Sequence, residues 1–503
     1  MNLRAVTFLL GCVLAILSAF LVVPLLVGLA FGEEQAVLAF AQAVALTGLV
    51  GGGLAFLNRG SARTREGRPD YFRREGLAVV GLTWIVAGVG GALPYLFAGT
   101  FASPGDAFFE SVSGFTTTGA TALSPEGIDG LPKALSFWRS FSHWLGGFGI
   151  VMVFVILFPA GGRNLFRSEV AGISREAGQQ RVRDSVLGLM RIYVGMSVFE
   201  ALLLWWSGLT WFDAFVHTFG TIATGGFSSH SSSVAYFASY KVELILVVFM
   251  FAAGINFSLY DGMLRLGFRD GFKRLVGSEE VRTYTFMVVS STLAIGCVLW
   301  FWGGSNGEAE STLPDYRSFW LAMRDSLFQV VSIQTSTGYG TADFDRWPEF
   351  CRLLLMLLAV VGASAGSTGG GLKVVRFLIV AKAALSGVRR FVRPRAIHSV
   401  KVDGQTLEDS SVAAITSYFV LWTLVLLFGT LVLGMFGIEP LTASTAVLAT
   451  LNNIGPGLVA VGPNMNYGAL PELVKWLLSL FMILGRLEFY AVVALFVPGF
   501  WRR

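Results

Sequence analysis

Four short glycine-containing segments recur along the chain, and their backbone is suited to binding a bare cation. Glycine permits backbone angles that aim successive carbonyl oxygens at one axis, and rings of such oxygens can replace the water shell of an alkali ion. Four reference glycines, Gly119, Gly226, Gly338 and Gly455, are 107, 112 and 117 residues apart. This spacing predicts an internal fourfold repeat. The segments are Thr117-Thr118-Gly119-Ala120-Thr121, Thr224-Gly225-Gly226-Phe227-Ser228, Ser336-Thr337-Gly338-Tyr339-Gly340 and Asn453-Ile454-Gly455-Pro456-Gly457.

The third segment comes closest to Thr-Val-Gly-Tyr-Gly, the filter sequence of potassium channels, so potassium is the expected ion. In the second segment either Gly225 or Gly226 could be the central filter glycine. Gly226 is preferred because it keeps the thirteen-residue spacing. The residues predicted to form the potassium filter are Thr117, Thr118, Gly119, Thr224, Gly225, Gly226, Ser336, Thr337, Gly338, Tyr339, Asn453, Ile454 and Gly455.

A short helix is expected before each segment. Thirteen residues before the reference glycines lie Asp106, Asp213, Asp325 and Thr442, and these residue types favour helix N-caps. A helix that enters from outside and stops halfway would point its partly negative C-terminus at the cavity below the filter. The predicted unit is therefore an apolar helix, a capped pore helix, a glycine turn and a second apolar helix.

Close packing of membrane helices is the alternative explanation for the glycines. Packing is the expected role of Gly146, Gly147 and Gly149. Four segments in register, each preceded by a capping residue at the same distance, favour a pore instead.

The composition is that of a polytopic membrane protein. Of the 503 residues, 54% are hydrophobic and 14% charged, and the mean hydropathy of +0.66 excludes an ordinary soluble globular protein. We predict an all-α fold with two leading transmembrane helices and four helix–pore-helix–helix pseudo-repeats around one central ion pore. The first apolar run is read as an uncleaved span. The predicted spans are 5–31, 36–57, 76–99, 137–160, 186–207, 241–262, 284–303, 350–383 (interrupted), 411–437 and 471–497.

The expected domain boundaries follow from these spans. The two N-terminal helices occupy 1–58, and the four repeats occupy 76–165, 183–275, 280–395 and 405–503.

Basic residues are concentrated in alternate loops. They cluster at 59–74, 163–191, 265–282 and 373–401 and at both ends of the chain. The positive-inside rule then makes both termini and the basic loops cytoplasmic, and the glycine turns enter from outside. Charges divided among short loops do not suggest nucleic-acid binding.

One predicted span is interrupted by small residues that cannot hold a rigid helix. A loop here could block the pore if it lies below the filter, whereas an ordinary hinge or packing kink is the alternative. The residues are Ala363, Ser364, Ala365, Gly366, Ser367, Thr368, Gly369, Gly370 and Gly371.

Arg486 lies in the last apolar run, where a charge is costly unless it faces water or a partner. One interpretation places it in the cavity below the filter, where it would weaken cation binding enough to allow release. The alternative is a buried pair with Glu488 or with a carbonyl group.

Titratable groups form no obvious relay across the membrane. A potassium symporter coupled to protons or sodium remains an alternative, although it predicts such a relay. An integral-membrane enzyme is a more remote alternative, because it would need convergent nucleophiles, acids or metal ligands. Most of the glutamates Glu110, Glu200 and Glu243 are expected to make structural polar contacts. The four histidines, which are far apart in sequence, are His143, His217, His230 and His398.

The chain resembles the Trk/Ktr/HKT superfamily of potassium transporters, and within it the TrkH-type membrane subunit of bacteria. The resemblance covers essentially all residues and is most specific at 114–121, 222–228, 337–339, 452–457, 366–371 and 484–486. It implies a multi-pass protein of the inner membrane, surrounded by lipid, in which residues 363–371 form the gate. It also implies a homodimer with one pore per subunit, bound to a cytoplasmic TrkA-like nucleotide-binding ring that carries NAD(H) or ATP/ADP. K+ is the transported ion, and no tightly bound organic cofactor is expected in this chain.

Overall fold

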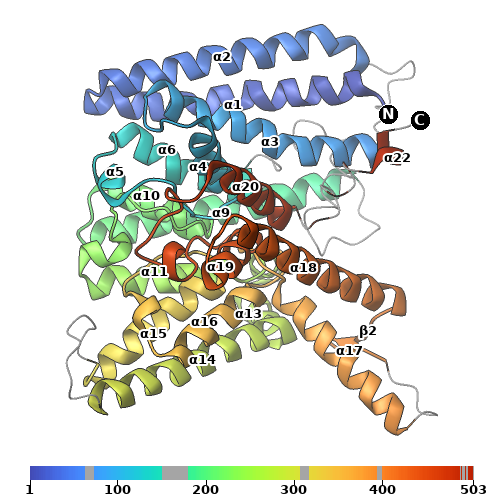
Figure 1. Cartoon of the computed structure of the whole chain (residues 1–503). Helices are drawn as coiled ribbons and strands as arrows, with labels where there is room; N and C mark the ends of the chain where they lie inside the picture. Colours follow the sequence, from blue (N-terminus) through green and yellow to red (C-terminus); the bar gives the residue numbers. More distant parts are fainter. Residues whose placement is uncertain are drawn as a thin grey trace.

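The chain forms a bundle of helices in the computed structural model, which describes residues 1–62, 73–149, 179–305, 316–393, 399–487, 489, 493, 495 and 497–501 (Figure 1). Six of the described helices are long and apolar enough to cross a membrane. Helices satisfy their own backbone hydrogen bonds, as a lipid environment requires. The six match six of the predicted spans within a few residues, except that α9 begins earlier. They are α1 (Leu3–Phe31), α2 (Glu34–Asn58), α3 (Arg73–Phe97), α9 (Gln179–Trp206), α14 (Glu279–Ser305) and α18 (Asp409–Met435).

Helices α1 and α2 lie side by side along one edge of the bundle (Figure 1). Their backbones touch at two glycines: a Cβ on Gly51 would lie 2.6 Å from the amide nitrogen of Ala15, and one on Gly11 would lie 2.7 Å from that of Ala55. Close crossings of this kind are typical of membrane helices, which associate through small residues.

Three of the remaining predicted spans are not single long helices, and two of these three run into undescribed residues. The span at 137–160 comprises α6 (Lys133–Trp144) and a π-helical turn (Leu145–Gly149), after which it leaves the described residues. The span at 350–383 is interrupted, as expected, between α16 (Glu349–Val361) and α17 (Val374–Val392). The last span begins as α20 (Glu472–Arg486).

The predicted span at 241–262 is bent sharply, which the sequence analysis did not foresee. The segment divides into α11 (Tyr240–Ala253) and α12 (Phe257–Leu266), bent by 87°. Gly254 ends the first helix, and Asn256 caps the second by accepting a 2.9 Å hydrogen bond from the amide of Ser258. A polar cap inside an apolar run therefore starts a new helix direction.

Short helices precede all four glycine segments: α4 (Pro104–Phe115), α10 (Trp211–Ile222), α15 (Phe319–Gln334) and α19 (Pro440–Leu451). The predicted N-caps Asp106, Asp213, Asp325 and Thr442 are wrong; the N-cap residues are Ser103, Thr210, Ser318 and Glu439.

Three of the residues predicted as caps instead occupy the first helical turn, and Asp325 lies deeper because α15 is about one turn longer. Acidic residues in a first turn are stabilised by the helix dipole, so an aspartate there resembles a cap in the sequence.

The remaining elements are short connections. Two strands, β1 (Lys401–Val402) and β2 (Gln405–Thr406), pair antiparallel in a small hairpin. The others are 3-10 turns at Arg59–Ala62, Ser233–Phe237, Phe344–Arg346 and Val459–Val461, and helices α5 (Pro125–Asp129), α13 (Phe268–Gly277) and α22 (Pro498–Trp501).

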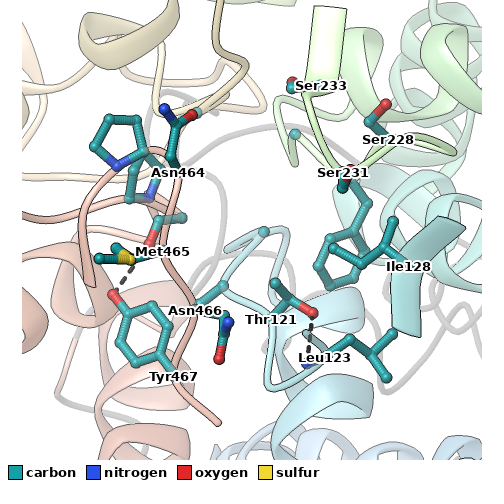
Figure 2. A pocket seen from close by; sticks show the side chains of 18 of the residues that line it. Thr121, Leu123, Ile128, Ser228, Ser231, Ser233, Asn464, Met465, Asn466 and Tyr467 are labelled. Atoms are coloured by element: carbon teal, nitrogen blue, oxygen red, sulfur yellow. Dashed lines mark hydrogen bonds between the residues drawn. The ribbon is translucent and has the colours of Figure 1, made fainter. Parts of the chain in front are cut away.

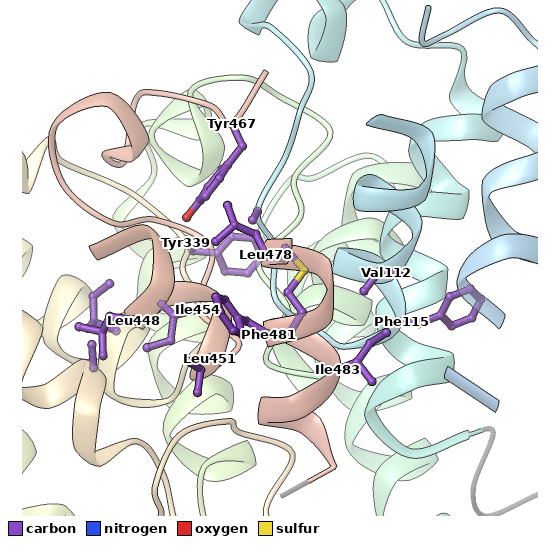
Figure 3. Packing of buried hydrophobic residues seen from close by; sticks show 14 of the residues in the cluster. Val112, Phe115, Tyr339, Leu448, Leu451, Ile454, Tyr467, Leu478, Phe481 and Ile483 are labelled. Atoms are coloured by element: carbon purple, nitrogen blue, oxygen red, sulfur yellow. The ribbon is translucent and has the colours of Figure 1, made fainter. Parts of the chain in front are cut away.

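The short helices α4 and α19 pack in the apolar core. Figure 3 shows Leu478 and Phe481 of α20 among side chains of α4 and α19, including Val112 and Leu451. All four side chains are almost completely buried. This packing holds the short helices in place although each is too short to cross a membrane.

Candidate cation pathway

The glycine segments share an uncommon backbone conformation. Gly119, Gly226 and Gly338 have φ of 79°, 82° and 80°. Left-handed conformations cost a residue with a side chain about 1–3 kcal/mol, so their recurrence at one register indicates a common requirement. Gly226, and not Gly225, occupies the position equivalent to Gly119. Two residues before each reference glycine, the left-handed region is occupied by Thr117, Thr224, Ser336 and Asn453, with φ between 53° and 60°.

The four short helices end in the same way. In each, the amide of the residue before the reference glycine bonds to a carbonyl five residues earlier, which anchors the start of the turn. The pairs are Thr118 N to Ser113 O (2.9 Å), Gly225 N to Gly220 O (2.7 Å), Thr337 N to Ser332 O (2.9 Å) and Ile454 N to Ala449 O (2.8 Å).

The reference glycines touch one another in a closed ring. A Cβ on Gly119 would overlap the carbonyl oxygen of Gly225, and one on Gly226 would overlap that of Thr337. A Cβ on Gly338 would lie 2.9 Å from Cδ of Pro456, and one on Gly455 would lie 2.8 Å from the carbonyl oxygen of Gly119. Segments separated by more than 100 residues thus surround one axis.

Hydrogen bonds join the residues around each glycine segment, including Arg139 of α6, to the neighbouring segment around this ring. They run from Arg139 Nη1 to Ser228 O (3.2 Å), from Ala235 N to Gly340 O (3.2 Å), from Val459 N to Asp345 Oδ2 (3.0 Å) and from Tyr467 N to Thr121 O (2.8 Å).

A cavity of about 90 Å³ opens above the ring and is lined by all four reference glycines. Figure 2 shows its wall, with Asn464, Asn466 and Tyr467 on one side and Ser228 and Ser231 on the other. The Tyr467 hydroxyl donates a 3.0 Å hydrogen bond to the carbonyl of Gly455. Polar groups therefore line this cavity next to the ring.

The loop at 363–371 contacts the ends of the short helices. Thr368 Oγ1 donates a 2.9 Å hydrogen bond to the carbonyl of Ile222, the last residue of α10. The amide of Gly370 donates a 2.6 Å bond to Ser336 Oγ, and a Cβ on Gly370 would overlap the carbonyl of Asn452. The loop therefore lies against the side of the ring opposite this cavity.

The same loop is bonded to the break between α11 and α12. The amide of Ser364 donates to the carbonyl of Gly254, and the amide of Phe257 donates to the carbonyl of Gly366, both at 3.0 Å. Since sequence analysis missed this break, it also missed these partners. Asn256, a polar residue after a glycine in an apolar run, was the available signal.

Arg486 lies beside the loop. Its Nη1 donates a 2.9 Å hydrogen bond to the carbonyl of Thr368, and its Nη2 donates 3.1 Å bonds to the carbonyls of Gly146 and Gly147. The carbonyl alternative considered for Arg486 is thus present, whereas Glu488 is outside the described residues. A Cβ on Gly146 would overlap the carbonyl of Phe115, which agrees with the packing role expected for that glycine.

The histidines serve the protein framework in the described part of the chain. His143 Nδ1 lies 2.7 Å from the carbonyl of Gly114, and His217 Nε2 lies 3.0 Å from Ser228 Oγ. His398 is outside the described residues, among which no cluster of metal-ligating side chains occurs.

The membrane-spanning helices and the ring of glycine turns define a polytopic membrane protein with a candidate ion pathway. The sequence profile of TrkH, described as a cation transport protein, matches residues 38–502. This chain belongs to the TrkH family.

Named relatives match along the whole chain. The Trk system potassium uptake protein TrkH of Escherichia coli K12 is 36% identical over 510 residues, covering 100% of both chains. TrkG of the same organism is 31% identical, covering 100% of this chain and 99% of the relative. The crystal structure of the potassium transporter TrkH from Vibrio parahaemolyticus has a TM-score of 0.87 and 34% sequence identity, covering 100% of both chains.

Proposed function

We propose that this protein takes up potassium across the bacterial inner membrane through a selective, gated pore. Four pseudo-repeats surround the pore, and their glycine segments form its filter. The observation that carries the proposal is the closed contact ring of Gly119, Gly226, Gly338 and Gly455 between an outer cavity and the loop at 363–371. The potassium transport named for the relatives supports the same choice of ion.

In the proposed mechanism, a hydrated ion enters the outer cavity and exchanges water for backbone carbonyl oxygens in the ring. The C-termini of α4, α10, α15 and α19 then favour a cation below the ring, because each carries a partial negative charge. Water and buried protein, not lipid, surround this irregular backbone. The protein supplies a fixed substitute for hydration and needs no chemical step.

The loop at 363–371 is proposed as the gate. Its hydrogen bonds to Ile222 and Ser336 hold it against the ring, so conduction requires the loop to leave this position. Arg486, fixed to the carbonyl of Thr368, would place a positive charge beside the path. This charge would lower cation occupancy and speed release.

Regulation is proposed to come from a cytoplasmic TrkA-like nucleotide-binding ring that carries NAD(H) or ATP/ADP, acting on a homodimer of this chain. Helix α17 begins directly after the loop, and the ammonium group of Lys373 donates to the carbonyl of Gly369. A displacement of α17 by a partner would therefore reach the gate. The partner can act only by binding the closed and open states with different affinity.

Flux measurements on proteoliposomes test the function. Potassium, rubidium and sodium gradients and the pH gradient are varied independently, with and without the nucleotide-binding ring. We expect potassium and rubidium flux that follows their own gradients and exceeds sodium flux. Uptake driven by a proton or sodium gradient against the potassium gradient would favour the symporter.

A further inference from the structure

In each repeat, a side chain of the short helix contacts the residues that follow the reference glycine. These residues are called the outer arm of the glycine turn, and the contact is called a tie. Nine residues before three reference glycines lie Glu110, His217 and Gln329. The carboxylate of Glu110 accepts from Thr121 Oγ1 at 3.0 Å and from the amide of Ala122 at 2.9 Å. These bonds fix the chain just after Gly119.

The same tie recurs with different chemistry in the other turns. His217 Nε2 lies 3.0 Å from Ser228 Oγ, and Gln329 Nε2 donates to the carbonyl of Ala342 at 3.2 Å. In the fourth turn the equivalent residue is Ala446, and its neighbour Thr445 accepts a 3.1 Å bond from the amide of Leu458 instead. Among these four ties, only the one in the first turn carries a full charge.

Arg139 completes the tie of the first turn and extends it to the second. Its Nε donates a 2.8 Å bond to Glu110, and its Nη1 donates a 3.2 Å bond to the carbonyl of Ser228. The guanidinium lies 4.1 Å from the ring centroid of Phe227. Side-chain exposure is 2% for Arg139 and 0% for Glu110. One ion pair thus fixes the outer arms of two adjacent turns.

We propose that Glu110 and Arg139 are positioning residues that set the cation selectivity of the filter. The proposal rests on the filter assigned above. Carbonyl rings distinguish potassium from sodium through the number and placement of their oxygens. Charge-assisted hydrogen bonds are stronger than neutral ones and have more defined geometry, so this pair restricts the arms more than the other ties do.

The other repeats provide a substitution that avoids a buried unpaired charge. Gln329 occupies the position of Glu110, and Leu246 and Leu358 occupy that of Arg139, twenty residues after their reference glycines. The double variant Glu110→Gln/Arg139→Leu therefore gives the first repeat the residues of the third. Single substitutions would strand one charge in the interior and endanger folding.

A second ion pair, in which Glu243 is buried and the Arg324 side chain is 34% exposed, supplies the control. Glu243 of α11 accepts a 2.6 Å bond from Arg324 Nε of α15, beside an apolar groove lined by Leu244 and Trp320. The control variant Glu243→Gln/Arg324→Leu makes the same chemical change in a carboxylate–guanidinium pair that borders this groove and not the glycine segments.

Both variants are reconstituted, and rubidium and sodium uptake are measured per molecule of membrane protein. We expect the Glu110/Arg139 variant to reach the membrane normally but to lose about tenfold in the ratio of rubidium to sodium uptake. The Glu243/Arg324 variant should keep the ratio of the unmodified protein.

Two results would overturn the inference: an unchanged ratio in the Glu110/Arg139 variant, or an equal loss in both variants. Gly338→Ser, measured in parallel, separates this failure from failure of the filter itself. A ratio that falls in Gly338→Ser but not in the double variant rejects the positioning pair alone. A ratio unchanged in both rejects the filter assignment.

Discussion

Arg486 Nη1 donates a 2.9 Å hydrogen bond to the carbonyl oxygen of Thr368, which joins the end of α20 to the loop below the glycine ring. The other terminal nitrogen of the same guanidinium bonds to the carbonyls of Gly146 and Gly147. One side chain therefore connects parts of the chain from the first, third and fourth predicted repeats. Its planar fork suits this arrangement, which the point charge of a lysine could not reproduce.

Gly338→Ser should weaken the preference for rubidium over sodium by about tenfold, equivalent to ~1.4 kcal/mol. The φ of +80° strains any side-chain-bearing residue, and the new Cβ would lie 2.9 Å from Cδ of Pro456. Relative isotope uptake provides the measurement. Gly340→Ser is the control, because a Cβ there meets open space. An unchanged ratio at normal membrane levels would remove Gly338 from the filter.

Arg486→Ala should raise the apparent affinity for potassium, because a fixed positive charge near the path repels the ion. Affinity is measured from the concentration dependence of flux. Arg486→Lys keeps the charge without the fork and should retain the lower affinity. If Arg486→Ala misfolds and neutralising Glu488 restores it, a buried pair is the correct explanation instead.

Shortening the loop at 363–371 by several residues should raise flux and reduce dependence on the nucleotide-binding ring, with selectivity unchanged. The deletion would shift the closed-to-open equilibrium of the loop, through which the nucleotide-binding partner is proposed to act. Liposome flux measured with and without this partner checks the prediction. A packing hinge predicts lower protein levels with unchanged flux per molecule and unchanged dependence on the ring.

Thr368→Val should have a milder effect in the same direction. It removes the hydroxyl that bonds to Ile222 while nearly preserving shape, and a lost hydrogen bond of this kind costs about 0.5–1.5 kcal/mol. Flux measured in the absence of the nucleotide-binding partner is expected to rise several-fold. Ser367→Ala serves as the control, since that hydroxyl bonds within the loop to Ser364. Equal flux in the two variants would contradict a role for the Thr368 contact in closure.

Asp129→Asn should destabilise the contact between the loops that carry Asp129 and Ser231 at neutral pH but not in acid. Asp129 accepts a 2.8 Å bond from the amide and a 2.6 Å bond from the hydroxyl of Ser231, and these bonds hold the pKa of the carboxyl below its usual range. Their stabilising effect is present above the ordinary pKa of about 3.9 and is lost as pH falls through the lowered value. Thermal unfolding across this range should show the two proteins converging in acid. A constant difference would contradict the linkage.

Local sequence signals identified the glycine turns, because left-handed backbone and helix termination are properties of a few neighbouring residues. The same signals misplaced the caps, since Asp106 is as favourable in a first helical turn as before it. They missed the bend at Gly254 because one glycine in an apolar run is common. The hydrogen-bond partners of Arg486 could not be predicted from local sequence signals, because Gly146 lies 340 residues away in sequence.

The loop at 363–371 is attached to the α11–α12 break through main-chain atoms, from Ser364 to Gly254 and from Phe257 to Gly366. Substitution of a side chain leaves these atoms in place, so the attachment persists as the surrounding sequence diverges. The two donating amide protons are withheld from solvent while the loop is seated. The rate at which these amides exchange with deuterium would report how often the loop leaves this position, without a measurement of ion current.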